Sequence, residues 1–340
     1  MEAHDASARR AIAAPDGPLF FPAGVALVAD VDLDLLANGR RVLGGSPTRL
    51  LRLGPRAAAV LARWLDGGAV SADPAERRLA RRLVSAGLLH PDPAGADPPD
   101  LTLVTVVVPV RDRPESLRRT LGGLDGVAVI VVDDASRCAA EIERVADGAG
   151  ARYHRLARNV GPAAARNAGV ALVSTPFVAF VDSDCVPSRG WLAPLLAHFV
   201  DPAVGAAAPR VMATGPGWLA RYEAARSPLD LGDRPSLVRP RTRVAYVPTA
   251  ALVVRRSLAG EPCFDESLRG GEDVDFVWRM VAAGWNVRYE PASTVLHDTD
   301  RGPLGWAARR AFYGATAGPL ARRHPGQVAA VSLPGWLALG

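Results

Sequence analysis

Three pairs of acidic residues occur along the chain, each beside a predicted strand end or helix start. They are Asp133-Asp134, Asp182-Ser183-Asp184 and Glu272-Asp273. The ligand crevice of an α/β sheet lies outside the carboxyl ends of its strands, where such carboxylates would meet. We therefore predict one site that holds a divalent cation, a nucleotide diphosphate and a general base.

Asp182 and Asp184 directly follow the apolar stretch 177–181. Two acids one residue apart can reach the same Mg²⁺ or Mn²⁺ ion, which takes its other ligands from substrate phosphates and water. Such an ion would neutralise a departing diphosphate. A solvated turn is the less favoured alternative, because charges close behind a buried strand cost desolvation energy unless they have a partner. His297 is a further candidate metal ligand, with an ordinary packed histidine as the alternative.

Another acidic pair and one arginine also have both a functional and a structural interpretation. Asp133 and Asp134 can accept hydrogen bonds from a nucleobase or ribose, whereas Asp134 or Ser136 could instead cap the following helix. Arg166 stands at a helix start after Gly161-Pro162, where guanidinium and backbone donors suit phosphate. A solvated helix arginine is the alternative.

Glu272 and Asp273 open a predicted amphipathic helix over 274–283. The helix dipole stabilises acids at this position without any catalytic role. The functional interpretation makes Asp273 the general base, which deprotonates an acceptor hydroxyl as its oxygen attacks an anomeric carbon. Attack from the face opposite the diphosphate inverts the anomeric configuration.

The hydrophobic pattern places these residues on an α/β sheet. The β-branched stretch 103–110 is typical of a buried parallel strand. Further helix and strand patterns follow it, at 115–124, 127–132, 177–181, 191–199, 244–254 and 287–289. This alternation predicts a doubly wound sheet.

A small module precedes the sheet. Short strand patterns with a turn signal at Asn38-Gly39 are followed by helical patterns at 55–64 and 75–86. This order resembles the PqqD-like winged-helix domains that hold a peptide along a strand edge, and a structural appendage is the alternative. The expected divisions are a mobile tail, the module, a proline-rich linker, the sheet domain and an apolar segment, at 1–22, 23–90, 91–100, 101–315 and 316–340.

The composition favours small anionic partners over nucleic acid. The net charge is +5, but the 40 basic residues, all of them arginine, are scattered along the chain. Aromatic residues make up only 6% of the chain, and no aromatic-rich basic stripe suited to nucleic acid is present. Three distant cysteines fit neither a disulfide framework nor a zinc site, so we expect a reducing cytoplasm.

We expect neither a signal peptide nor a membrane-spanning helix. The start of the chain lacks a basic and apolar signal pattern, and no stretch reaches the roughly 20 apolar residues that span a bilayer. Arginines at 309, 310, 322 and 323 precede an apolar tail at 328–340. The tail is expected either to pack on the domain or to contact the anionic inner face of the membrane peripherally.

Several motifs in a fixed order resemble the family-2 glycosyltransferases of GT-A fold. Across the region 101–300 they are Val131-Val132-Asp133-Asp134-Ala135-Ser136, Gly161-Pro162 with Ala165-Arg166-Asn167, Asp182-Ser183-Asp184, and Gly271-Glu272-Asp273 with Trp278-Arg279. The resemblance implies a mixed GT-A sheet, a UDP-sugar donor, a divalent metal ion and inversion.

The resemblance also implies roles for individual positions. The donor-nucleotide residues would be Pro109, Asp133, Asp134, Arg166 and Asp182. The metal ligands would be Asp182 and Asp184, together with His297. The acceptor-binding residues would be Thr249, Ala250, Glu272 and Trp278, with Asp273 as the base.

A closer resemblance is to the subfamily that serves mycofactocin biosynthesis. It rests on the segments 227–232 and 247–256 and on the small module. It implies transfer of glucose from UDP-glucose to a peptide-derived small-molecule acceptor. The Gln-x-x-Arg-Trp motif of processive members is absent, and Trp306-Ala307-Ala308-Arg309-Arg310 occupies that region. We therefore do not expect long-chain polymerisation.

Other functions fit the sequence less well. A nucleotidyltransferase or a dehydrogenase would need a glycine-rich phosphate loop after the first strand, but the segment 109–114 contains no glycine. A family-2 enzyme with a polysaccharide or lipid acceptor is one remaining alternative. A non-catalytic peptide-binding protein with the same carboxylates is the other.

Overall fold

The computed structural model describes residues 12–15, 20–93, 99–260, 262–298 and 302–328. The expected tail at 1–22 and the apolar segment at 316–340 therefore lie partly outside the described residues. None of the helices that the structure describes combines the length and the apolar character that crossing a bilayer requires.

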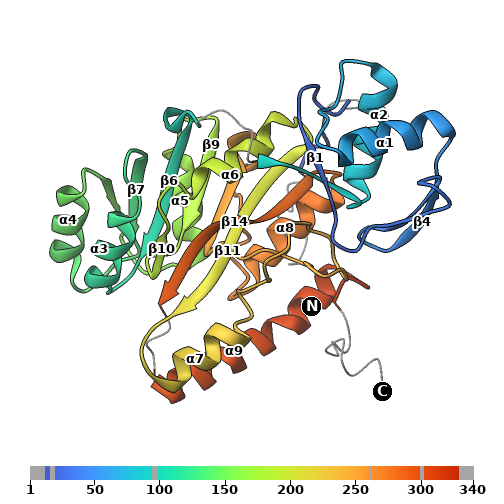
Figure 1. The fold of residues 1–340 in the computed structure, drawn as a ribbon. Coiled ribbons are helices and arrows are strands. Elements are labelled where there is room, and N and C mark those ends of the chain that lie inside the picture. The colour runs from blue at the N-terminus through green and yellow to red at the C-terminus, as the bar shows by residue number, and fades with distance from the viewer. Residues whose placement is uncertain (1–11, 16–19, 94–98, 261, 299–301, 329–340) are drawn as a thin grey trace, which may run out of the picture.

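A mixed sheet forms the centre of the larger domain (Figure 1), with strands in the order β10-β14-β11-β13-β9-β6-β7-β8 and with β12 also paired to β14. The strands are β6 (Val104–Val110), β7 (Ala128–Asp133), β8 (Arg152–Arg155), β9 (Phe177–Val181), β10 (Cys185–Pro187), β11 (Val204–Thr214), β12 (Ser236–Leu237), β13 (Ala251–Arg255) and β14 (Asn286–Asp298). The expected mixed α/β sheet is confirmed.

Helices cover both faces of this sheet. One apolar cluster joins the sheet to α5 and α8, and a second joins it to α3, α4 and α6. The helices are α3 (Pro114–Gly122), α4 (Ala139–Gly148), α5 (Pro162–Ala171), α6 (Leu192–Ala197), α7 (Gly217–Arg226), α8 (Glu272–Ala282) and α9 (Gly302–Arg323). Short 3₁₀ turns lie at Leu101–Leu103, His198–Val200 and Arg256–Leu258.

The parallel strands bring the acidic segments to one edge. β6 pairs in parallel with β7 and with β9, and β7 pairs in parallel with β8. Most side chains of β6 and β9 are buried, since helices cover both faces. The carboxyl ends of β6, β7 and β9 therefore lie side by side, which is where an α/β sheet binds ligands.

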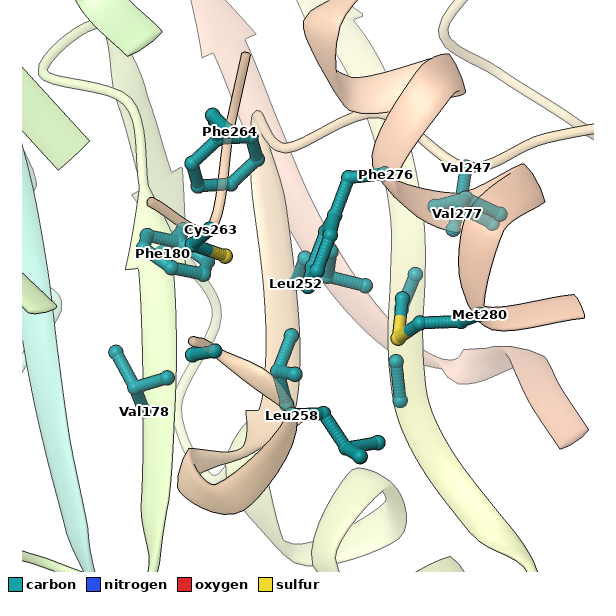
Figure 2. Packing of buried hydrophobic residues seen from close by; sticks show 14 of the residues in the cluster. Val178, Phe180, Val247, Leu252, Leu258, Cys263, Phe264, Phe276, Val277 and Met280 are labelled. Atoms are coloured by element: carbon teal, nitrogen blue, oxygen red, sulfur yellow. The ribbon is translucent and has the colours of Figure 1, made fainter. Parts of the chain in front are cut away.

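An aromatic cluster supports the start of α8 beside that edge (Figure 2). The Phe264 ring packs edge-to-face on Phe180 of β9, with ring centroids 5.1 Å apart. It also packs at 5.1 Å on Phe276 of α8. Leu252 of β13 and Met280 of α8 belong to the same buried cluster. Apolar packing thus fixes α8 relative to the strands whose ends form the site.

The small module has an apolar core of its own, formed by buried residues that include Leu61, Trp64 and Leu83. Its elements are β1 (Leu27–Ala29), β2 (Asp34–Leu36), β3 (Arg41–Gly44), β4 (Arg49–Arg52), α1 (Pro55–Leu65), α2 (Pro74–Ser85) and β5 (Leu89–Pro91). Nη1 and Nη2 of Arg81 donate to Asp201 at 2.7 and 2.6 Å and join the module to the sheet domain. Its likeness to PqqD-like domains stays a prediction.

The predicted strand over 244–254 is wrong for its first part. Only Ala251–Arg255 forms β13, and residues 244–250 form a loop. Pro248 has no N–H to donate to a strand ladder. Nε1 of Trp278 donates to the backbone oxygen of Ala245 at 2.8 Å and holds the loop on α8.

Long elements late in the chain also differ from the prediction. β14 extends far beyond the expected 287–289, and its register with β11 shifts between Pro209 and Arg210. Sequence patterns did not indicate β11, which is rich in alanine, a residue depleted in strands. Helix α9 runs through the expected boundary at 315, so the helix and not a domain edge occupies that position.

Candidate active site

A cavity of about 1400 Å³ opens at the carboxyl ends of β6 and β9. The loop 239–250, the start of α8 and one face of α9 complete its walls. All but one of the residues that the sequence indicated line this cavity. They are Pro109, Asp134, Arg166, Asp182, Asp184, Thr249, Ala250, Glu272, Asp273, Trp278 and His297.

Asp133 is the exception, because its side chain points into the protein and is fully buried. Its carboxylate accepts hydrogen bonds from Ser136 N at 2.8 Å and from the Tyr153 hydroxyl at 2.7 Å. Burial raises the pKa of Tyr153, and the hydrogen bond to Asp133 raises it further. The expected contact of Asp133 with a nucleotide does not fit this arrangement, in which Asp133 shapes the turn after β7.

Asp134 lines the cavity beside the start of α5 and does not cap α4. Its two carboxylate oxygens accept hydrogen bonds from Val160 N at 2.7 Å and Gly161 N at 2.9 Å, just ahead of α5. Ser136 Oγ accepts from Asp112 N at 3.0 Å. Because α4 begins after Cys138 without a side-chain cap, the capping interpretation is wrong for both residues.

Asp184 and His297 are the residues best placed to share a metal ion. His297 lies on β14 opposite Cys185 of β10, and its Nε2 is 3.8 Å from Oδ1 of Asp184. Nη1 of Arg113 donates to the other oxygen, Oδ2, at 2.6 Å. One carboxylate and one imidazole are a suitable partial donor set for Mg²⁺ or Mn²⁺, which would draw its other ligands from phosphate and water.

No three His, Cys, Asp or Glu side chains in the described part of the chain are arranged as a complete metal site. Asp182, the third predicted ligand, instead accepts a hydrogen bond from Arg166 Nη2 at 2.6 Å. Burial raises the pKa of Asp182, and the charge of Arg166 offsets part of that increase. The residues fit an ion held mainly by substrate, with Asp184 and His297 as protein ligands.

Arg166 is buried, and two carboxylates engage its guanidinium. Besides Asp182, Nη1 donates to Oε1 of Glu272 at 2.9 Å. Burial alone would lower the pKa of Arg166, but these two carboxylates outweigh it and raise the pKa. Both terminal nitrogens are thus engaged, each through one N–H, and Arg166 lines the cavity, so its expected contact with a nucleotide stays a prediction.

Asp273 lies in the first turn of α8, where its Oδ1 accepts from Val274 N at 2.8 Å. Burial raises the pKa of Asp273 to about 6, and the adjacent Glu272 carboxylate adds to the increase. A base works best when its pKa is close to the working pH. Asp273 thus has the electrostatic setting of a general base that accepts a proton near neutrality.

Sequence reasoning missed the outer wall, which is one face of α9. Cavity-lining residues recur along it at spacings of three and four, at Gly305, Ala308, Arg309, Phe312, Tyr313, Thr316, Ala317 and Leu320. That helical spacing is the signal that could have found it. Burial raises the pKa of the Tyr313 hydroxyl on this face.

The helix α9 is seated tightly on the start of α8. A Cβ at Gly270 would lie 2.6 Å from Cζ of Phe312, and one at Gly271 would lie 2.9 Å from Cδ1 of Leu320. Gly271 also has a φ of 77°, which favours glycine. A Cβ at either glycine would therefore force a side chain of α9 to move.

The solved structure of mannosyltransferase PcManGT from Pyrobaculum calidifontis, in complex with GDP-Man and Mn²⁺, shares this fold. It is 20% identical in sequence and superposes with a TM-score of 0.50, covering 68% of this chain and 66% of that chain. The succinoglycan biosynthesis protein ExoU of Rhizobium meliloti is 26% identical over 198 residues, which are 54% of this chain and 58% of that protein.

A stronger similarity is to the pre-mycofactocin glycosyltransferase of Mycobacterium tuberculosis strain H37Rv. The two sequences are 46% identical over 323 residues, which are 92% of this chain and 67% of that protein. Residues 105–259 match the family described as Glycosyl transferase family 2, and this region contains β6, β7, β9 and the Asp182–Asp184 loop. This chain is a glycosyltransferase with a GT-A-like fold, and it belongs to glycosyl transferase family 2.

Proposed function

We propose that this enzyme transfers a sugar, with inversion, from a UDP-sugar to a hydroxyl of a small peptide-derived acceptor, in the presence of Mg²⁺ or Mn²⁺. One observation carries the proposal. A single cavity contains the candidate metal ligands Asp184 and His297 and the candidate base Asp273, whose pKa is about 6.

The donor side of the cavity lies against β6 and the start of α5. Pro109 and Asp134 line it, and Asp134 fixes the backbone of Val160 and Gly161 beneath it. We assign the base and ribose of UDP to this side, with the diphosphate toward Asp184. Glucose is our proposed sugar, on the resemblance of the chain to the mycofactocin subfamily.

In the proposed mechanism, Asp273 accepts the proton of the acceptor hydroxyl as that oxygen forms a bond to the anomeric carbon. The bond between the anomeric carbon and the UDP oxygen breaks at the same time, and UDP leaves with the electron pair. A bound Mg²⁺ or Mn²⁺ would offset the negative charge of the leaving diphosphate. Attack and departure on opposite faces invert the configuration.

The acceptor side lies between the loop 239–250, α8 and α9. Thr249, Ala250 and Trp278 line it, as does Glu272, whose Oε1 accepts from Arg166. We propose mycofactocin glycosylation because the relative with 46% identity is named for that reaction. A polysaccharide acceptor is less favoured, since the succinoglycan protein is only 26% identical.

Calorimetric titration of UDP with and without Mn²⁺ tests the donor site. We expect UDP to bind in the presence of Mn²⁺ and to bind much more weakly without it. UDP-sugars are then tested as donors, with peptide-derived phenols and alcohols as acceptors and an oligosaccharide for comparison. If UDP binds under neither condition, the transferase proposal is wrong for this chain.

A further inference from the structure

We propose that Arg166 is a positioning residue that ties the loop after β9 to the turn that carries the general base. In this role Arg166 binds neither nucleotide nor sugar. It fixes the distance between the proposed metal ligand Asp184 and the proposed base Asp273. The inference rests on the proposed function, and it adds to that function a link between two separate elements of the site.

Helix α5 gives Arg166 a rigid base. Gly169, three residues further along the helix, lies so close to β6 and β7 that a Cβ there would be 2.3 Å from Cγ1 of Val107 and 3.1 Å from Cγ2 of Val132. Ala165 and Val170 are fully buried in the same cluster. The backbone that carries Arg166 is therefore fixed against the strands whose ends form the site.

The guanidinium of Arg166 contacts one aromatic ring and two carboxylates. Its central carbon lies 5.7 Å from the ring centroid of Phe264, the aromatic residue that packs on Phe180 (Figure 2). Its side chain is only 5% exposed, and Nη1 and Nη2 donate to two different carboxylates. A planar fork of this kind fixes direction as well as charge, which a lysine ammonium cannot do.

The two carboxylates come from separate elements, and each is close to a residue with a proposed chemical role. Asp182 follows β9 and stands two residues before Asp184. Glu272 opens α8 and directly precedes Asp273. Arg166 therefore spans the cavity floor from the metal side to the base, and its two partners are 90 residues apart in the chain, at 182 and 272.

Removal of the bridge would leave the buried Glu272 and the partly buried Asp182 without their cation. Glu272 is 8% exposed, so its charge is costly to bury alone. The first turn of α8 would then shift, and Asp273 with it. A displacement of about 1 Å in a reacting group can lower the rate by about a hundredfold.

Three single variants separate this role from a general structural one. Glu272→Gln, which keeps the shape of the side chain, should lower kcat by about ten- to a hundredfold while Mn²⁺-dependent UDP affinity stays within about twofold of wild type. Asp182→Asn should weaken Mn²⁺-dependent UDP binding. Arg166→Lys should show both effects. The assays are run at about pH 8, where Asp273 is deprotonated.

The double variant Arg166→Lys with Glu272→Gln tests whether the arginine acts through the glutamate. If it does, the double variant has the same kcat as Arg166→Lys alone, within about twofold. Multiplied losses in kcat would overturn the bridge, as would a Glu272→Gln enzyme with wild-type kcat. Glu272→Gln preserves side-chain volume, so this arm remains informative even where Arg166→Lys does not fold.

Arg81→Lys is the matched control. Arg81 also makes a two-point contact with a carboxylate, that of Asp201, but it joins the small module to the sheet domain and does not line the cavity. The Arg81→Lys variant should keep wild-type kcat and UDP affinity.

A wild-type enzyme that fails to bind UDP with Mn²⁺ would count against the proposed function. A wild-type enzyme that binds UDP, with variants that do not separate as described, would count against the bridge alone.

Discussion

Nη1 of Arg309 on α9 lies 3.2 Å from Nε2 of His297 on β14. An arginine N–H can only donate, so Nε2 is the acceptor, and the ring proton of a neutral His297 is on Nδ1. The lone pair of Nε2 is therefore directed at Arg309, and a metal ion at this position would have to replace that hydrogen bond. Nη2 of the same guanidinium lies 4.0 Å from Oδ2 of Asp184. A positive side chain thus lies beside both proposed protein ligands of the metal.

We expect Arg309→Gln to bind Mn²⁺ more tightly than wild type in the absence of nucleotide. Removal of one positive charge near the ion is worth about 1 kcal/mol at a water-like dielectric, or roughly fivefold in affinity. Titration with Mn²⁺, followed by calorimetry or electron paramagnetic resonance, measures this affinity. The control is Arg310→Gln, since Arg310 is the next residue but donates to Glu223 at 2.7 Å and does not line the main cavity. Equal Mn²⁺ affinity in all three proteins would contradict the prediction.

The metal side of the site is tested by Asp184→Asn, which keeps the side-chain shape. We expect this variant to lose the Mn²⁺ dependence of UDP binding, because one of the two proposed protein ligands no longer carries charge. Isothermal titration of UDP at several Mn²⁺ concentrations shows it. A variant with the same Mn²⁺ dependence as wild type would remove Asp184 from the metal site.

The activity should depend on pH through Asp273. A base acts when it is deprotonated, and burial raises the pKa of Asp273 to about 6. We therefore expect kcat/KM to be constant above about pH 7 and to fall about tenfold per unit below about pH 6. The pH profile of sugar transfer with saturating metal measures this. Asp273→Asn should lose transfer by about a hundredfold or more while it still binds UDP. If the residual activity of that variant still fell below about pH 6, the titrating group would be another residue.

Stability offers a test of the packing beneath Arg166. Gly169→Ala should destabilise the enzyme by about 1–3 kcal/mol, because the added Cβ has no space beside Val107. Gly148→Ala is the matched control, since it lies at the end of α4 with no atom within 4 Å of an added Cβ. It should stabilise by about 0.4–1 kcal/mol. Urea denaturation of both variants gives the difference, and equal midpoints would show that α5 can move away from β6.

Local patterns predicted the buried parallel strands and the position of the acids, because those depend on neighbouring residues. The stretches 103–110 and 177–181 are mostly β-branched or aromatic and were predicted to within a residue of β6 and β9. The start of α8 at Glu272 follows from glycines and acids in sequence. Chain order then sufficed to predict that strand-end carboxylates share one edge.

Side-chain partners could not be predicted, because they depend on residues far apart in the chain. The orientation of Arg166 toward Glu272 joins positions separated by 106 residues. The inward turn of Asp133 depends on the Tyr153 hydroxyl, 20 residues away. The segment 244–250 was predicted as a strand because it is rich in apolar residues, but it is a buried loop held by Trp278 on another element.

The contact of Gly270 and Gly271 with Phe312 and Leu320 makes the outer wall and the catalytic turn mechanically dependent on each other. Helix α9 cannot come much closer to this turn unless Phe312 or Leu320 moves, and if it lifts away, the turn before Asp273 loses its packing. In the proposed function, the wall of the acceptor side and the turn that carries the base therefore share one packed surface, so a change on either would be felt by the other.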